Sequence, residues 1–273
     1  MVRNHLLPTQ QENTTLYDLW WARIHELLLL LLTINFLFLT LQSCGLDVED
    51  PTPPSPPVWV QKSLPEEWPE QGIDAHETGG IFMEWQSNHN QGIIAYLIYR
   101  AKYFEESDSL GEYVVLSRIE TDLYTGLSYI DSDLLLGTKY FYKLKAEDNS
   151  ENRSDFSESL GFSLLPQIPI GTMTPNGLLD TLDGEVKLIW RYDNNVEMED
   201  YCLTLTNLNA DCVFREVFNP GNYLDGTEQR IIPTSVVFEP GQIYLWRIDT
   251  GAKYVDGLET AASESPWATF LYQ

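Results

Sequence analysis

Hydrophobic and polar residues alternate with a period of two along several short segments of the chain after residue 57. In "GGIFMEWQ", Ile81, Met83 and Trp85 fall on one side of an extended backbone, and the residues between them fall on the other. A period of two indicates strands with one face turned toward a core. The same alternation occurs around Tyr96, Tyr140, Tyr201 and Tyr244, with the turn signals "DNSEN", "NPGNY" and "EPG" between such segments. No long helical period follows Cys44, so the pattern predicts an all-β body.

These alternating segments occur twice. Landmarks of the first set recur 104 or 105 residues later in the second set. The matching positions are Trp85 and Trp190, Tyr96 and Tyr201, Leu134 and Phe238, and Tyr140 and Tyr244. Landmarks that keep step over such a distance predict two copies of one domain. Short strands, frequent turns and about 100 residues per copy are typical of a β-sandwich.

An uncharged apolar run of fifteen residues, 27–41, precedes the body. Its length suits the core of a signal peptide better than a membrane span, which needs about 20 residues. No formal charge occurs between Glu26 and Asp47, so a longer uncleaved anchor is the alternative. The preceding region has only Arg3 and Arg23 as basic residues, which makes the positive-inside signal weak. Both interpretations place the body outside the cytoplasm.

The segment Leu41-Gln42-Ser43-Cys44 resembles the lipobox of bacterial lipoproteins. The resemblance implies a diacylglyceryl thioether on Cys44, cleavage after Ser43 and acylation of the new amino terminus. Two or three acyl chains give stable anchoring, at about 0.8 kcal/mol per buried methylene. Gly45 and the acidic "DVED" are similar to the sorting region of lipoproteins that reach the outer membrane. We therefore expect a lipid anchor in a bacterial outer membrane, with the body facing the periplasm or the cell surface.

Prolines and acids dominate the segment 44–57, which begins "CGLDVED" and ends "PTPPSPP". Proline favours extended polyproline geometry, and the acids keep the segment solvated. We expect a tether that holds the first domain up to about 40 Å from the bilayer.

The first copy resembles a bacterial fibronectin type III domain over residues 57 to 165, and the second, about 168 to 273, resembles it more loosely. The resemblance places Trp85 and Trp190 on the second strand and Tyr96 and Tyr201 on the third. It also implies a tyrosine corner in each copy, formed by Leu134 with Tyr140 and by Phe238 with Tyr244. All eight residues are expected to be structural. The second copy departs through a cysteine pair, a shorter approach to its corner and a longer last loop, "GAKYVDGLETAASESPW".

The fold predicted from these observations is all-β, with two tandem immunoglobulin-like, fibronectin type III-like β-sandwiches after an N-terminal signal helix. The predicted boundaries are 1–43 for the signal peptide, 44–57 for the tether, 58–166 for the first sandwich and 167–273 for the second. The linker around "LLPQIPIG" is short and contains prolines, which favours a semi-rigid pair.

If Cys44 is lipidated, two cysteines are left, Cys202 and Cys212. They flank "LTLTNLNAD", which predicts a strand, a turn and a strand. We expect a disulfide across this hairpin, worth about 2–3 kcal/mol, because oxidising compartments permit it. Two separate buried thiols are the alternative.

The chain carries 41 acidic and 16 basic residues, a formal charge of −25. Nucleic-acid binding starts with lysine and arginine neutralising phosphates, so this charge argues against a nucleic-acid partner. The aromatic fraction of 12% is ample for packed cores. The acidity indicates a soluble, solvated surface.

Catalytic motifs are not evident after Cys44. The only histidines there are His76 and His89, and no nucleophile elbow, H-E-x-x-H or P-loop pattern occurs. A carboxylate pair for glycoside cleavage stays open as an alternative, although a filled sandwich offers no deep cleft. Calcium in the acidic segments 193–200 or 147–152 also stays open, although neither matches a recognised loop. We expect no enzyme, no cofactor and no metal.

Loops on a rigid sandwich are its ordinary binding sites. The candidates are Asn149, Glu151 and Arg153 in the first copy and Lys253, Tyr254 and Trp267 in the second. We expect a non-catalytic, lipid-anchored envelope protein whose sandwiches act as a spacer and an adhesion or interaction surface. Its expected partners are the membrane, through the lipid, and other envelope or surface proteins or glycans. A glycan-binding accessory module of a surface polysaccharide system is the alternative, and a carboxylate glycosidase is a third.

Overall fold

A computed structural model describes residues 20–21, 23–25, 27–33, 52–61, 71–88, 92–121, 127–192, 198–221, 226–255 and 258–273, without the side chains of 252–259. The chain divides into two compact units, residues 1–50 and 51–273. In the first unit the described residues are helical and exposed. None of the described helical segments is both long enough and apolar enough to cross a membrane. The lipobox, Cys44 and His89 lie outside the described residues.

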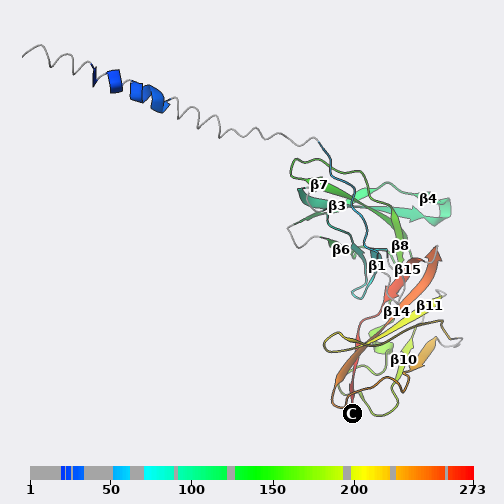
Figure 1. The fold of residues 1–273 in the computed structure, drawn as a ribbon. Coiled ribbons are helices and arrows are strands. Elements are labelled where there is room, and N and C mark those ends of the chain that lie inside the picture. The colour runs from blue at the N-terminus through cyan, green and yellow to red at the C-terminus, as the bar shows by residue number, and fades with distance from the viewer. Residues whose placement is uncertain are drawn as a thin grey trace, which may run out of the picture. The chain divides into compact units, whose positions relative to one another are not determined.

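The second unit contains two β-sandwiches, which confirms the predicted all-β class. The first sandwich packs a sheet of three antiparallel strands against a larger sheet (Figure 1). The small sheet has the order β1 (Ile73–His76), β2 (Gly80–Glu84) and β6 (Ser128–Asp131). The strands of the larger sheet are β3 (Ile93–Phe104), β4 (Ser109–Leu110), β5 (Val114–Glu120), β7 (Lys139–Asp148) and β8 (Leu160–Leu164). In it, β7 lies between β3 and β8, and β4 and β5 pair with β3.

The core of the first sandwich is built from the inward positions of the alternating strands. Ile81, Met83 and Trp85 are at most 1% exposed, as the period-two pattern requires. The rings of Trp85 and Tyr96 meet edge to face across the core, with centroids 5.5 Å apart. Tyr140 accepts a hydrogen bond at its hydroxyl from the backbone amide of Leu135, at 3.3 Å. This is the bond that a tyrosine corner makes.

The second sandwich repeats this plan. Its smaller sheet pairs β10 (Lys187–Arg191) with β13 (Thr227–Ile231). Its larger sheet contains β9 (Thr181–Leu182), β11 (Asp200–Asn207), β12 (Cys212–Phe218), β14 (Ile243–Val255), β15 (Leu258–Glu264) and β16 (Ala268–Tyr272). Trp190 packs against Tyr201 with ring centroids 5.7 Å apart, and the Tyr244 hydroxyl accepts from the amide of Glu239 at 2.9 Å. Both copies therefore contain the same structural landmarks.

The expected tether ends earlier than residue 57. Pro54 and Pro57 are buried, and the Asn88 side-chain amide donates to the carbonyl of Ser55 at 2.7 Å. Two residues further on, Trp59 belongs to the core and donates through Nε1 to the carbonyl of Glu158 at 2.9 Å. The end of the proline segment is therefore packed onto the first sandwich, because its proline rings find apolar surface there.

The disulfide expectation was wrong, since Cys202 and Cys212 are not bonded to each other. The hairpin itself is present, but Cys202 pairs in register with Val217, and Cys212 pairs with Thr206. The two cysteines therefore stand four positions apart along the ladder, about 13 Å at 3.3 Å per residue. That separation is beyond the reach of a disulfide. Cys202 is fully buried and Cys212 is exposed, so the alternative of two buried thiols holds only for the first.

The segment expected to be a long last loop is instead a hairpin that reaches the first sandwich. β14 continues to Val255 and turns back as β15, and β15 pairs in parallel with β8 through Ala261 and Ala262 (Figure 1). Ala262 is 2% exposed and belongs to the core of the first sandwich. One sheet therefore runs through both sandwiches.

Candidate functional site

The outward side of β7 carries three lysines. Alternate residues of this strand, Tyr140, Tyr142 and Leu144, point into the core. The residues between them lie on the opposite face and are half-buried: Lys139, Phe141, Lys143 and Lys145. The sequence "KYFYKLK" thus supplies the core and a basic outer face from one strand.

Aromatic rings support these lysines. The Lys143 ammonium lies 4.4 Å from the ring centroid of Tyr113, and the Lys145 ammonium lies 4.3 Å from that of Phe156. The Lys139 ammonium lies 5.1 Å from the ring of Phe141. Such cation–π contacts limit the rotamers of long side chains and hold the charges near the sheet. We call this surface the lysine face; its residues are Tyr99, Tyr113, Lys139, Phe141, Lys143, Lys145 and Phe156.

The rings of the lysine face also pack on one another. Tyr99 and Phe156 meet edge to face, with centroids 4.9 Å apart. Phe156 nevertheless remains 39% exposed. Gly161, which pairs with Phe141 across to β8, leaves the space that Phe141 and Lys139 occupy, since an added Cβ would stand 2.7 Å from the Phe141 ring and 2.9 Å from Lys139 Cε. A glycine at this position therefore shapes one end of the face.

Five of the sixteen basic residues of the chain lie on the lysine face or beside it: Arg118, Lys139, Lys143, Lys145 and Arg153. Arg100 and Lys102 also lie on β3, but they pair in register with the core residues Tyr142 and Tyr140 and therefore lie on the other side of the sheet. The arginines are matched by carboxylates, whereas Lys139, Lys143 and Lys145 have no acidic residue within ion-pair distance among the described residues. Three unmatched ammonium groups on a chain with 41 acids require an explanation.

Glu147 is one of two acids of β7, and two arginines neutralise it. Arg118 donates to its Oε1 at 2.7 Å, and Arg153 donates to its Oε2 at 2.8 Å. The hydrogen bond from Arg118 lowers the pKa of Glu147 below its ordinary value, against a smaller raising effect of burial, and Arg153 adds to the lowering. The acid is therefore a positioning group for the arginines, and the excess charge of the face remains positive.

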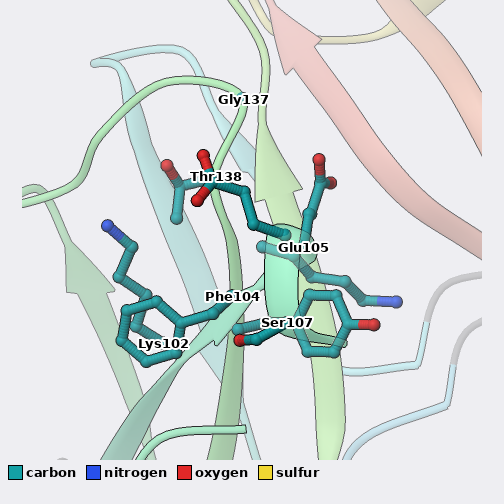
Figure 2. A pocket seen from close by; sticks show the side chains of 9 residues that line it. Lys102, Phe104, Glu105, Ser107, Gly137 and Thr138 are labelled. Atoms are coloured by element: carbon teal, nitrogen blue, oxygen red, sulfur yellow. The ribbon is translucent and has the colours of Figure 1, made fainter. Parts of the chain in front are cut away.

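A hollow of about 580 Å³ continues from the lysine face at the end of β3. Figure 2 shows Lys102, Phe104, Glu105 and Ser107, from the end of β3 and the short 3₁₀ helix η1 (Glu105–Ser107), with Gly137 and Thr138 from the turn before β7. Tyr103 and Lys139 also line it, so Lys139 belongs to both the hollow and the lysine face. Glu105 and Glu106 make this end of the surface acidic.

The structure separates the loop residues expected to bind. Asn149 and Glu151 are exposed in a tight turn after β7, where the carboxylate of Asp148 accepts from the amides of Ser150 and Asn152, both at 2.9 Å. Only Arg153 of this group contacts the basic region, through Glu147. These contacts occupy the acid that a calcium ion in 147–152 would need, and most of the segment 193–200 lies outside the described residues.

The second group lies on the other sandwich. Lys253 and Tyr254 belong to strand β14 rather than to a loop, and their side chains are outside the described part of the chain. Trp267 stands between β15 and β16 and is half-buried, with the Arg247 guanidinium 5.0 Å from its ring centroid. Trp267 is therefore a packing partner of Arg247 more than an exposed anchor.

Carboxylates gather at the junction of the two sandwiches. Arg247 donates to both oxygens of Glu264, at 3.0 and 2.8 Å, and its Nε lies 3.1 Å from Asp249. Burial raises the pKa of Glu264 to about 9, with a further contribution from the charge of Asp249 and a smaller opposing one from Arg247. Asp74 and Glu77, at β1 of the first sandwich, add to the raising. These paired acids share one arginine, which gives them a structural role.

No group of three metal-ligating side chains occurs within the described ranges. His76, one of the two histidines after Cys44, bonds through Nδ1 to the Thr78 hydroxyl at 2.9 Å in the turn after β1. This contact is a local turn interaction.

Sequence reasoning missed the lysine face because it searched the loops. The signal that identifies it is the period-two lysine pattern of 139–145, in which every outward position but one is a lysine. The partner rings Tyr113 and Phe156 come from other segments, so only the fold brings them to the lysines.

No family model and no curated protein matches the chain. Among solved structures, the FN1–FN3 domains of chicken CNTN1 match 81% of this chain and 69% of their own, at 15% identity and a TM-score of 0.34. An Fn3-like protein from Clostridium thermocellum matches 43% of this chain and 98% of its own, at 18% identity and a TM-score of 0.29. A β-1,2-glucanase from Parabacteroides distasonis matches 40% of this chain and 14% of its own, at 23% identity and a TM-score of 0.28. At these values the likenesses carry no argument about activity, and the β-sandwich architecture rests on the strand pairing of the chain itself.

Proposed function

We propose that the protein is a non-catalytic component of a bacterial cell envelope, tethered through a lipid on Cys44. Its two sandwiches act as a stiff spacer that presents the lysine face to a partner. The observation that carries this proposal is the sheet that runs from β12 of the second sandwich to β3 of the first, because it makes residues 51–273 one unit. A spacer needs such stiffness, and an interaction surface needs a rigid scaffold.

The sequence supports the tether and the outer-membrane location. The apolar run 27–41 leads directly to the lipobox-like Leu41–Cys44, and acids and prolines follow. Replacing Cys44 by serine should leave an unprocessed chain that lacks the lipid and keeps residues 1–43. It should also remove the body from the outer-membrane fraction, because the uncleaved apolar run 27–41 retains the chain where it was inserted. Mass spectrometry of the purified amino terminus and membrane fractionation measure both. An unchanged mass and an unchanged outer-membrane location would refute the tether.

Which side of the outer membrane the body faces is tested on whole cells. A body that faces outward is digested by added protease while the outer membrane is intact, whereas one that faces the periplasm survives. The second candidate function, a glycan-binding module, is favoured by the aromatic rings of the lysine face, since aromatic rings pack against the apolar faces of sugars. A carboxylate glycosidase has less support, because the paired acids at the junction are held by Arg247.

A further inference from the structure

We propose that the lysine face binds an anionic polysaccharide, one whose sugars carry carboxylate or sulfate groups. This inference deepens the interaction role proposed above and rests on it. The partner is identified by charge: Lys139, Lys143 and Lys145 are unmatched within the described residues, while the rest of the chain is strongly acidic. No described carboxylate neutralises these ammonium groups, so an external anion is their electrostatic complement.

The ammonium groups are arranged along a line. Lys139 and Lys145 are six residues apart on one straight strand, which places their Cα atoms about 20 Å apart at 3.3 Å per residue. Lys143 lies between them on the same face. A polymer with regularly repeated charges fits such a line better than a single small anion does.

The lysines are held in place before any ligand arrives. Tyr113, Phe141 and Phe156 support their side chains at 4.3 to 5.1 Å. Side chains that are already ordered lose less entropy on binding, so this arrangement favours affinity. The exposed part of Phe156 offers an apolar contact to a sugar ring.

An acidic peptide fits the face less well. β7 is hydrogen-bonded to β3 on one side and to β8 on the other, so its backbone offers a peptide strand no free edge. A peptide that adds a strand to a sheet requires an edge. A ligand on the lysine face can therefore contact only side chains, through their charges and their aromatic rings.

Acidic residues at one end of the lysine face limit how far an anionic ligand can extend along it. Glu105 and Glu106 line the hollow that continues from Lys139, and they would repel an anionic chain there. We therefore place the ligand over Lys143 and Lys145, with Lys139 at its end.

The test titrates the purified full-length protein, in detergent, with polygalacturonate and with dextran sulfate, and follows binding by calorimetry. Neutral dextran and polyglutamate serve as comparison polymers. We expect both anionic polysaccharides to bind, with an affinity that falls as salt rises, and dextran and polyglutamate to bind at least tenfold more weakly. Binding of polyglutamate as tight as that of the polysaccharides would overturn the inference in favour of an acidic protein partner, and no binding at low salt would overturn it outright.

Variants locate the site. Lys143→Gln together with Lys145→Gln should weaken binding by about tenfold or more, because each lost exposed ion pair contributes a few-fold. Lys187→Gln, on β10 of the second sandwich, is the matched control and should leave binding unchanged. If the glutamine variant does not fold, Lys143→Arg with Lys145→Arg keeps the charge and should keep the binding. Equal loss in the control, or no loss in the double variant, would refute the location.

The tether and the ligand are tested separately. The Cys44→Ser variant should bind polysaccharide as the parent does, since the lysine face belongs to residues 51–273. Polysaccharide binding together with an unchanged mass and an unchanged outer-membrane location of Cys44→Ser would refute the tether alone. Loss of processing in Cys44→Ser, without any polysaccharide binding by the parent protein, would refute the ligand alone.

Discussion

The backbone amide of Leu165 donates to the carbonyl of Ala262 at 2.8 Å, and this bond continues the β8–β15 ladder past Leu164, the last residue of β8. Leu165 and Ala261, from different sandwiches, pack together and are nearly fully buried. Just beyond, the Gln167 side-chain amide donates to the carbonyls of Glu77 and Glu264, at 2.8 and 2.7 Å. The linker thus bonds to both sandwiches, and the semi-rigid pair favoured by the prolines has a direct structural basis.

Replacing Ala262 by lysine should open this junction. A long charged side chain cannot enter the core of the first sandwich, and we expect a loss of about 2–4 kcal/mol in the free energy of unfolding. Urea unfolding followed by tryptophan fluorescence should change from one transition to two, because the sandwiches would lose their shared sheet. Ser235→Lys, at an exposed turn, is the control and should leave the unfolding curve unchanged. An unaltered single transition in Ala262→Lys would show that the junction contributes little.

The stability should fall as pH rises from about 5 to about 9. Burial raises the pKa of Glu264 to about 9 in the folded chain, while its ordinary value is 4.5. The folded state therefore keeps a proton that the unfolded state has lost, and the stabilisation is complete below pH 4.5 and lost as pH approaches 9. Glu228, whose pKa burial also raises, adds a slope of the same sign.

Glu264→Gln should reduce this slope without removing it. Urea midpoints measured between pH 5 and pH 9 test the prediction, with exposed Glu185→Gln as the control. A slope that Glu264→Gln leaves as steep as in the parent would mean that Arg247 keeps Glu264 ionised in the folded protein.

Asp131 should be among the most sensitive acids of the first sandwich. It is 1% exposed, accepts from Arg100 at 2.8 Å and accepts from the Tyr142 hydroxyl at 2.9 Å. Asp131→Ala leaves a partly buried guanidinium without its carboxylate, which typically costs about 3–5 kcal/mol. Asp133→Ala, two residues away and exposed, should cost less than about 1 kcal/mol. Chemical unfolding of both variants measures the difference, and equal losses would contradict the ion-pair account.

The two cysteines of the second sandwich should behave as separate thiols. In a Cys44→Ser background, a thiol reagent should modify exposed Cys212 in the folded protein and buried Cys202 only after unfolding. A reductant should leave the melting temperature unchanged, because no crosslink is removed. A large fall in melting temperature on reduction would restore the hairpin disulfide.

The repeat was visible in the sequence because it rests on local patterns. The strands that contain Trp85 and Trp190 are predicted by the alternation of the residues next to them, and both tryptophans are buried. The β15 strand gave no such signal, since "LETAASE" is short of large apolar residues and pairs with a partner about 100 residues away. Small residues are what such a close approach requires, yet the same residues are also typical of loops.

The candidate site was hidden for a related reason. The alternating pattern around Tyr140 predicts the core positions of β7, and the lysines occupy the positions between them. Their unmatched state depends on which acids the fold brings near, and Glu147 is taken by Arg118 and Arg153. The missed register of Cys202 and Cys212 has the same origin, because pairing along a hairpin depends on the bulge between Leu205 and Thr206 as well as on spacing.

The pairing of β15, from the second sandwich, with β8 of the first also limits how the two domains can be rearranged. Sandwich modules joined by flexible linkers behave as beads that can be deleted, duplicated or reordered without harm to their neighbours. Here the hairpin of the second module closes the open edge of the first, so excising either one would leave an unprotected strand prone to aggregation. The two sandwiches therefore form the smallest unit that can be duplicated, and a longer version of this protein would have to repeat both together.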